Sequence, residues 1–370
     1  MVTPVLDLDQ LLRHAVERGA SDVHIKVGSP PFIRVDGRLD RTDLAAVSPV
    51  ETERIAFAIM PKQRAEEFIA SSEADFAYSV SGLGRFRVNV MRQRGSVGLV
   101  LRRVQSDIPS FEALGLPPVV RKLTDHQRGL VLVTGPTGSG KTTTLGSMID
   151  FINDNYNRHI VTIEDPIEIL HADKSSIVNQ REVGTDTADF HSALKRVLRQ
   201  DPDVILVGEV RDVETVKTAL TAAETGHLVF STLHTISATD SINRIIDFFA
   251  PHEQRQVRMS LAGSLRGIVS QRLVEKRTGG RAPAVEVLVS TGRIFDKIVN
   301  PDETHEIESI IAEGEYYGMQ TFDQSLLGLY KQGIIDLREA IAASTTPHDL
   351  RLMIEQYTME VAAEEVAAGQ

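Results

Sequence analysis

The chain has 370 residues, a formal net charge of -11 and no cysteine. The length predicts about two domains, the acidic balance argues against a generally nucleic-acid-binding surface, and the missing cysteines exclude disulfides and cysteine-ligated zinc. The first residues, MVTPVLDLDQLL, carry acids where a secretory signal needs lysine or arginine. The apolar runs are far shorter than the roughly 20 residues that span a bilayer. We therefore expect a cytoplasmic protein without direct membrane insertion.

Residues 1–105 combine helix and strand patterns and form the first predicted domain. DLDQLLRHAVERG predicts a helix that Asp7 or Asp9 caps and Gly19 ends. PFIRVDGRL and GRFRVNVMRQRGSVGLVLRRV alternate in polarity, which predicts strands. Residues 106–128 carry three prolines and predict a linker with a short helix inside it.

From residue 129 onward, short apolar runs alternate with helical segments. The runs are GLVLVTG, HIVTIED, DVILVGE and GHLVFSTLH, and each ends in glycine, an acid or histidine. This pattern predicts buried parallel strands in an α/β domain over residues 129–290. Ligands of such sheets bind at the carboxyl ends of the strands, where these polar residues lie. Residues 291–355 predict amphipathic helices, and residues 356–370 lack a periodic apolar face, which predicts a mobile tail.

The segment GPTGSGKT matches the phosphate-loop pattern G-x-x-x-x-G-K-[ST] completely, between the strand and the helix that this motif requires. Backbone amides and the helix N-terminus would face the phosphates. We expect Lys141 to reach the β and γ phosphates and the Thr142 hydroxyl to ligate Mg²⁺. A glycine-rich turn that binds nothing is the alternative. The candidate nucleotide-binding residues are Gly135, Pro136, Thr137, Gly138, Ser139, Gly140, Lys141, Thr142 and Thr143.

Acidic residues follow two of the predicted strands. Glu209 ends VILVGE, where an acid can polarise the attacking water or hold Mg²⁺ through its water shell. Glu164 and Asp165 end another run, and Glu168 lies one turn further on. Two acidic strand ends that face one phosphate loop are typical of a magnesium and water-activating site. Helix caps or solvated acids are the alternative for all four residues.

Two histidines flank the run LVFSTL. His227 and His234 are seven residues apart and would face opposite sides of an unbroken strand, which is poor geometry for one metal. His234 lies at the strand end, where it can sense a γ-phosphate, and His227 can face a neighbouring subunit. Core histidines bonded to backbone are the alternative.

Arginines concentrate near residue 90. Arg85 and Arg87 are two apart and share one face of a strand, whereas Phe86, the one aromatic in the run, points the other way. A single-stranded nucleic-acid groove would need interleaved aromatics. Arginine fingers toward a terminal phosphate or a solvated basic face remain as alternatives. The arginines of this run are Arg85, Arg87, Arg92, Arg94, Arg102 and Arg103.

Together these segments resemble the secretion ATPase superfamily and, within it, the PilT family of type IV pilus retraction ATPases. GASDVHI, PPFIRVDG, GRFRVN, the phosphate loop, TIEDPIE, VNQREVG, DPDVILVGEVRD and TAAETGHLVFSTLHT follow in the family's order. GMQTFDQSL resembles the retraction branch in particular, and the likeness extends from about residue 6 to residue 345. The resemblance implies a PAS-like α+β N-terminal domain and a RecA-like P-loop ATPase domain with a helical C-terminal part.

The resemblance also implies roles for individual residues. Glu209 matches the Walker B glutamate that activates water, and Glu164 matches the glutamate of the aspartate box. His227 and His234 match the family's paired histidine motif. The N-terminal domain of the family completes the site with arginines; by match these are Arg87 and Arg102, followed by Arg85 and Arg94.

The function implied is ATP hydrolysis with Mg²⁺ by a homo-hexamer that retracts type IV pili for twitching motility. Its expected partners are an inner-membrane platform protein and, indirectly, pilin, but no nucleic acid; partners would hold it at the inner face of the cytoplasmic membrane. The family's AIRNLIRE motif is replaced by RIFDKIVN at residues 293–300, where Ile294 and Ile298 keep the apolar spacing. Two alternatives therefore remain. One is a pilus assembly or type II secretion ATPase, although many of these carry a four-cysteine insert that this chain lacks. The other is an accessory ring with little hydrolysis.

Overall fold

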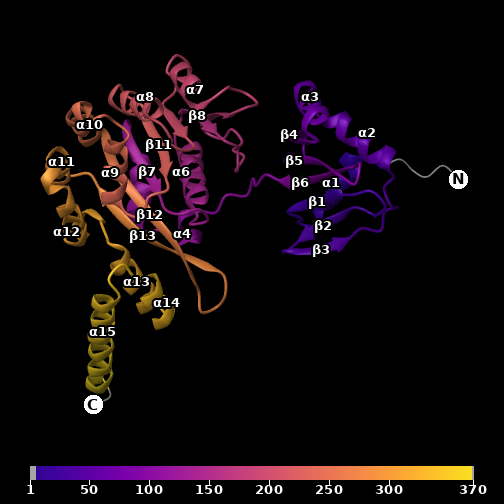
Figure 1. Cartoon of the computed structure of the whole chain (residues 1–370). Helices are drawn as coiled ribbons and strands as arrows, with labels where there is room; N and C mark the ends of the chain where they lie inside the picture. Colours follow the sequence, from indigo (N-terminus) through magenta and orange to yellow (C-terminus); the bar gives the residue numbers. More distant parts are fainter. Residues whose placement is uncertain (1–5, 369–370) are drawn as a thin grey trace. The chain divides into compact units, whose positions relative to one another are not determined.

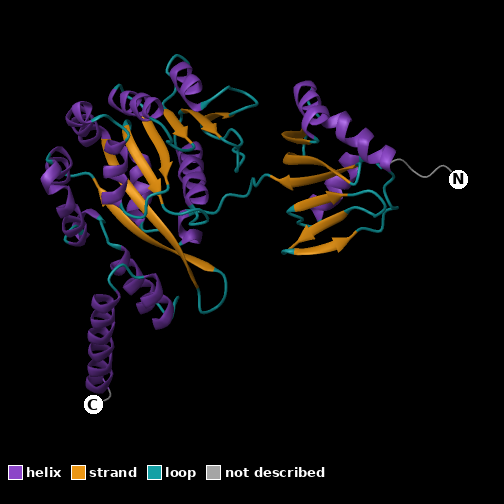
Figure 2. Cartoon of the chain, in the orientation of Figure 1, coloured by secondary structure: helices purple, strands orange, loops and turns teal. Residues whose placement is uncertain are grey.

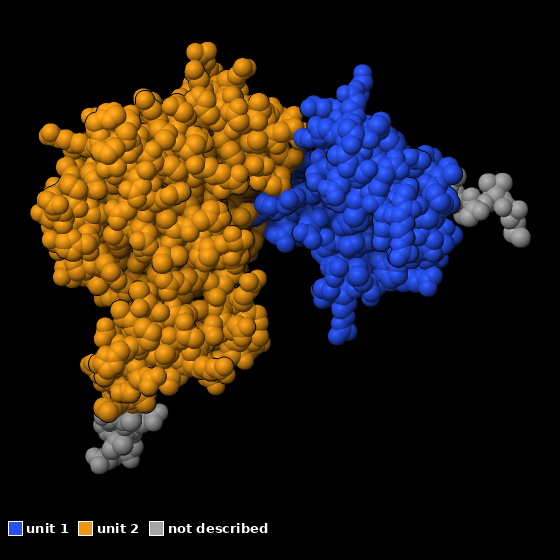
Figure 3. Space-filling model, in the orientation of Figure 1, with its two compact units in different colours: residues 1–107, 168–170 blue, residues 108–167, 171–370 orange. Residues whose placement is uncertain are grey.

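The computed structural model describes residues 6–368 and contains two compact units. Unit 1 consists of residues 1–107 together with residues 168–170, and unit 2 of residues 108–167 and 171–370 (Figure 3). Each unit has its own sheet and its own hydrophobic core (Figures 1 and 2). No helix among residues 6–368 is long and apolar enough to cross a bilayer.

Unit 1 is an antiparallel six-stranded sheet in the order β3-β2-β1-β6-β5-β4, accompanied by three helices. Its strands are β1 (Asp22–Ile25), β2 (Phe32–Val35), β3 (Arg38–Arg41), β4 (Glu73–Val80), β5 (Gly84–Gln93) and β6 (Ser96–Arg103). Its helices are α1 (Leu8–Glu17), α2 (Pro49–Ile59) and α3 (Lys62–Ser71).

Local sequence explains the ends of these elements. The predicted first helix is confirmed: the Asp7 carboxylate accepts hydrogen bonds from the backbone amides of residues 9 and 10, at 3.0 and 3.2 Å. The β5–β6 hairpin turns at Arg94 and Gly95, whose φ angles of 51° and 78° suit the right-handed twist of the strands. In β5, Phe86 is buried and Arg85 and Arg87 share the other face, as the alternation predicts.

Unit 2 is a seven-stranded sheet in the order β13-β12-β7-β11-β10-β8-β9, parallel except for β13. The four predicted strands are confirmed as β7 (Gly129–Thr134), β8 (His159–Glu164), β10 (Val204–Val207) and β11 (Leu228–Leu233). Three more strands were not predicted: β9 (Ile177–Glu182), β12 (Leu265–Glu275) and β13 (Arg281–Val289).

The central strands of unit 2 are buried on both faces, which explains their unbroken apolar runs. On β7, Leu130 and Leu132 belong to one core, and Val131 and Val133 belong to the other. The second core includes α4 (Phe111–Leu114), α5 (Pro118–Lys122), η1 (Leu123–Asp125) and α6 (Lys141–Asn155). The first includes α7 (Phe190–Val197), α8 (Val213–Glu224), α9 (Ala238–Asp247), α10 (Pro251–Ser264), α11 (Gly292–Val299) and α12 (Ile307–Ala312).

The remaining elements of unit 2 lie toward the C-terminus. They are η2 (Pro301–Glu306), η3 (Glu315–Tyr317), α13 (Phe322–Lys331), α14 (Leu337–Ala343) and α15 (Pro347–Ala368). A small core joins this helical part to the β12–β13 hairpin through Val274, Ala284 and Leu326, together with Leu350 and Ile354 of α15. The predicted combination of an α+β N-terminal domain with an α/β P-loop domain and a helical C-terminal part is thus confirmed.

Two segments contain more regular structure than their sequence indicates. The expected linker 106–128 contributes buried Phe111, Val120 and Leu123 to a core of unit 2, because its apolar side chains pack although prolines punctuate it. The helix α15 extends through the segment predicted to be a mobile tail as far as Ala368, and residues 369–370 lie outside the described residues. Alanine and glutamate favour this helix, although none of residues 355–360 is buried.

Candidate nucleotide-binding site

The phosphate loop connects β7 to α6, as the motif requires. Gly135, Gly138 and Gly140 have φ angles of 141°, 81° and 90°, which side chains rarely adopt. A Cβ at Gly135 would lie 2.3 Å from the Gln271 carbonyl oxygen, and a Cβ at Gly140 would lie 2.7 Å from the side-chain nitrogen of Gln271. Glycine is therefore required at both positions by backbone shape, and at Gly135 also by the close approach of the β12 backbone.

Polar groups gather inside the loop. The Lys141 ammonium is buried and donates hydrogen bonds to the carbonyl oxygens of Gly135 and Pro136, at 2.7 and 2.9 Å. Burial lowers the pKa of Lys141, and the nearby Glu209 carboxylate partly opposes this. The Ser139 hydroxyl is buried and has no hydrogen-bond partner among residues 6–368. A cation and an unsatisfied hydroxyl at a helix N-terminus fit an anionic phosphate group.

Glu209 lies just after β10 among polar residues from neighbouring strand ends. Its carboxylate contacts the Arg211 guanidinium and lies 3.6 Å from Nε2 of His234, which follows the adjacent strand β11. Arg211 also lies 4.0 Å from the carboxylate of Asp165, beyond the end of β8. The structure thus brings Glu209, His234 and Asp165 together, and Arg211 joins them. Sequence reasoning missed Arg211, although its place two residues after Glu209 was a signal.

Glu164 ends β8 and is 9% exposed. Its Oε1 atom accepts hydrogen bonds from the Thr162 hydroxyl at 2.6 Å and from the Gln180 amide at 3.1 Å. Glu168, one turn on, belongs to unit 1 and pairs there with an arginine. The two glutamates therefore occupy different surroundings, and only Glu164 ends a strand of the nucleotide-binding sheet.

The two histidines lie at opposite ends of β11. His227 precedes the strand, and its Nδ1 atom lies 3.0 Å from the Ala222 carbonyl oxygen, whereas His234 follows the strand near Glu209. The structure does not bring them together. Among residues 6–368 there is no group of three or more histidine, aspartate or glutamate side chains that could hold a metal ion by itself.

The segment after His234 is tied to neighbouring strands. The Thr235 hydroxyl lies 2.6 Å from that of Ser241 in α9, and the Ala238 amide donates a 2.6 Å hydrogen bond to Glu286 of β13. Glu286 is 5% exposed, and burial raises its pKa to about 7. In α6, just after the phosphate loop, the Thr144 hydroxyl donates a hydrogen bond to the side chain of Gln271 in β12 at 2.8 Å. Sequence analysis identified neither Gln271 nor Glu286, because β12 and β13 were not predicted.

The arginine candidates lie in unit 1, where strand register places Arg87, Arg102, Asp22 and Arg34 in one cross-strand row. Arg102 donates to the buried Asp22 carboxylate at 2.8 Å, and Arg34 lies 3.7 Å from it. Burial raises the pKa of Asp22, but hydrogen bonds from Ser21 and Arg102 outweigh it and hold the pKa below its ordinary value. This row is therefore a basic strip arranged around one ionised acid.

The other arginines of the run differ in their surroundings. Arg87 pairs with Glu168 at 2.7 Å, and both side chains are more than one-third exposed. Arg94 lies exposed in the β5–β6 turn, and Arg85 lies on the same strand face as Arg87. Arg87 and Arg102 are thus each paired with an acid of unit 1.

Comparison with known proteins places this arrangement in a family. The profile of the family described as type II/IV secretion system protein matches residues 2–317. The chain is 44% identical over 344 residues to the type IV pilus retraction ATPase PilT of Pseudomonas aeruginosa, which covers 93% of this chain and 100% of that protein. It is also 44% identical over 351 residues to the type IV pilus ATPase PilU of the same organism, over 95% of this chain and 92% of that protein. A crystal structure of the pilus retraction motor PilT with bound ADP has a TM-score of 0.85 and 48% identity, over 94% of this chain and 99% of that one. The chain belongs to the PilT family of type II/IV secretion ATPases.

Proposed function

We propose that this chain hydrolyses ATP with Mg²⁺ and that a homo-hexamer of it powers type IV pilus retraction in twitching motility. The observation that carries the proposal is the complete phosphate loop, with the Lys141 ammonium buried inside it and Glu209 and His234 at neighbouring strand ends. The likeness to a retraction ATPase over that protein's whole length supports the pilus role. An inner-membrane platform protein and, through it, pilin are the proposed partners.

Different residues of unit 2 would have different roles in ATP hydrolysis. Residues 135–143 hold the phosphates through backbone amides, and Lys141 neutralises charge on the β and γ groups. Mg²⁺ would supply further charge neutralisation when bound, and the Thr142 hydroxyl and, through water, Glu209 would hold it. Glu209 takes a proton from the attacking water, and Glu164 lies at the next strand end as the second acid.

His234 and the arginines would respond to the terminal phosphate. His234 lies beside Glu209 at the end of β11, which suits a sensor of that group. Arg87 and Arg102, followed by Arg85 and Arg94, are the proposed arginine fingers. Arg87 and Arg102 must first leave Glu168 and Asp22, so their engagement with nucleotide competes with pairs inside unit 1. His227 is proposed only for subunit contacts.

The test compares strains that carry wild-type protein, no protein, Lys141→Ala, or the matched control Lys122→Ala on the exposed surface of α5. We expect the deletion and Lys141→Ala strains to keep their pili and lose surface motility, and the control strain to behave like wild type. Purified protein should hydrolyse ATP and scatter light as a species near six times the 40.7 kDa chain mass. A deletion strain without pili would indicate an assembly ATPase instead.

A second candidate is an accessory ATPase ring that supports another motor. It is favoured by the changed stretch at residues 293–300. That stretch forms α11, and the two residues that keep the apolar spacing, Ile294 and Ile298, are fully buried in it. Lys297 pairs with Glu303 and Glu306, at 2.6 and 2.8 Å. Negligible hydrolysis by a pure hexamer would favour this candidate.

A further inference from the structure

The motif VNQREVG, residues 178–184, has entered the site so far only through the hydrogen bond from Gln180 to Glu164. Its first five residues complete β9, the edge strand beside β8. The parallel register pairs Thr162 with Gln180 and Glu164 with Glu182. The motif therefore lies along the strand that ends in Glu164.

The side-chain amide of Gln180 has its orientation fixed by two different partners. Its Oε1 atom accepts a hydrogen bond from the His171 backbone amide at 2.8 Å. A backbone N–H only donates, so the oxygen must face His171 and the NH₂ group must face the other side. That NH₂ group donates to Oε1 of Glu164 at 3.1 Å, where the Thr162 hydroxyl also donates.

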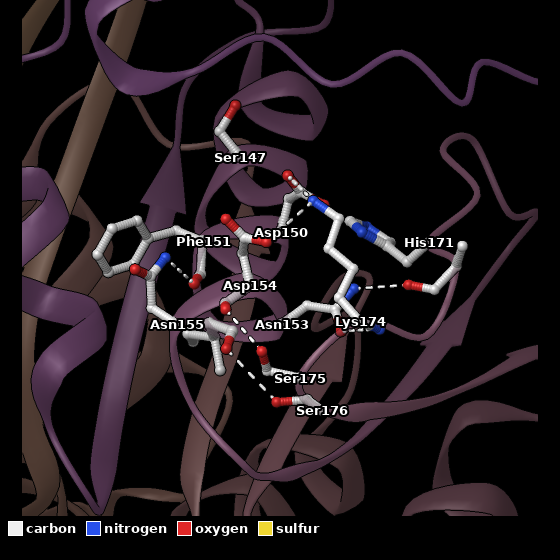
Figure 4. A network of polar contacts seen from close by, with 12 residues as sticks. Ser147, Asp150, Phe151, Asn153, Asp154, Asn155, His171, Lys174, Ser175 and Ser176 are labelled. Atoms are coloured by element: carbon white, nitrogen blue, oxygen red, sulfur yellow. Dashed lines mark hydrogen bonds and ion pairs between the residues drawn. The ribbon is translucent and has the colours of Figure 1, made fainter.

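His171 is held in turn by the helix that begins at the phosphate loop. Figure 4 shows the end of α6 against residues 171–176. The Asn153 side chain donates to the Ala172 carbonyl oxygen at 2.7 Å and accepts from the Lys174 amide at 3.1 Å. The Lys174 ammonium donates to Asp150 at 2.9 Å. The backbone that orients Gln180 is thus anchored to α6 by side chains of that helix.

We propose that Gln180 is a positioning residue for Glu164, because its oriented amide holds one carboxylate oxygen and so sets the plane of the carboxylate. This inference rests on the proposed ATPase function and on a role for Glu164 in it. Gln180 itself need not touch nucleotide.

Two variants of similar size separate this role from simple anchoring of the loop. Gln180→Met removes both hydrogen bonds, whereas Gln180→Glu keeps an acceptor for the His171 amide and presents a negative charge to Glu164. If Gln180 positions Glu164, both variants should lower kcat by about 10–100-fold, the range typical of outer hydrogen-bond partners. The KM for ATP and nucleotide binding should stay near wild type. Asn179→Asp, an exposed change on the same strand, is the charge-matched control and should keep wild-type kcat.

The double variants complete the experiment. In a Glu164→Gln background, neither change at position 180 should lower kcat further, since the group being positioned is gone. A thermal unfolding midpoint that falls in Gln180→Glu should recover when Glu164→Gln is added, because amide and carboxylate then exchange places.

Several results would overturn the inference. One is a wild-type kcat in Gln180→Met. Another is a near-normal kcat in Gln180→Glu together with a lowered kcat in Gln180→Met, which would indicate that Gln180 only anchors the loop. An equal further loss in the Glu164→Gln background would also contradict it. A wild-type chain that does not hydrolyse ATP would refute the proposed function itself, whereas an active wild type indifferent to position 180 would refute only this inference.

Discussion

The two units hold their candidate residues in different ways. In unit 2, Lys141, Glu209 and His234 are far apart in the sequence, yet they meet at one edge because parallel strands end there together. In unit 1, Arg87 and Arg102 lie in a row across antiparallel strands, where register decides the neighbours. The parallel sheet of unit 2 therefore places its candidate catalytic residues together at one edge, whereas the antiparallel sheet of unit 1 places its charged residues in a row across one face.

The largest expected effect is on ATP turnover and concerns Glu209, at the strand-end edge of the sheet of unit 2. Glu209→Gln should keep ATP binding and lower turnover by about 10²–10⁴, because an amide cannot take a proton from water. Steady-state hydrolysis and nucleotide binding by the purified variant would be measured side by side. The exposed change Glu313→Gln serves as the control. Near-normal turnover in Glu209→Gln would move the role to Glu164.

A smaller effect concerns Glu286, which ties α9 to β13 near the same edge. Its pKa is about 7 in the fold and 4.5 as an ordinary glutamate, so between these values the folded state binds the extra proton. Its stabilising contribution is therefore present below about pH 4.5 and is lost as the pH rises through 7. Relative to Glu286→Gln, the wild-type unfolding free energy should fall by about 3 kcal/mol over this range. Urea unfolding of both proteins at about pH 5 and about pH 8 measures most of this difference. Parallel pH dependence in the two proteins would contradict the buried, protonated state of Glu286.

The smallest effect concerns the strip of unit 1. The Arg87–Glu168 pair is 40% and 48% exposed, so Glu168→Gln should change the unfolding free energy by less than about 1 kcal/mol. If Arg87 is an arginine finger, freeing it should leave kcat unchanged or raise it, whereas Arg87→Ala should lower it. Arg103→Ala is the control in the same hairpin. A large loss of stability in Glu168→Gln would make the pair a structural bond and weaken the finger proposal.

Sequence reasoning predicted the fold best where burial is simple. The strands β7, β8, β10 and β11 are buried on both faces and read as unbroken apolar runs. Buried Gln271 and Glu286 interrupt that pattern in β12 and β13, and β9 lies at an edge where exposed side chains alternate with covered ones. Polar residues that bond to other parts of the fold thus interrupt the apolar pattern by which these strands could have been predicted.

The residues of the candidate site also differ in how far the sequence alone could predict them. The phosphate loop could be predicted because its chemistry depends on spacing within eight residues, and Glu164 and Glu209 because each ends an apolar run. Arg211, Gln180 and Gln271 were missed because their importance comes from partners elsewhere in the chain. The choice among the arginines also depends on acids distant in the sequence, such as Asp22 for Arg102.

The helix α15 has a consequence for the kinetics of hydrogen exchange. Leu350 and Ile354 are buried against the small C-terminal core, but none of residues 355–360 is buried. Backbone amides near Ile354 can exchange only when packed side chains separate, whereas those a turn or two later need only the helix itself to fray. A single continuous helix would therefore contain both slowly and rapidly exchanging amides, with the change of rate close to Ile354. A label or tag attached beyond that point would report local helix motion rather than the stability of the ATPase unit.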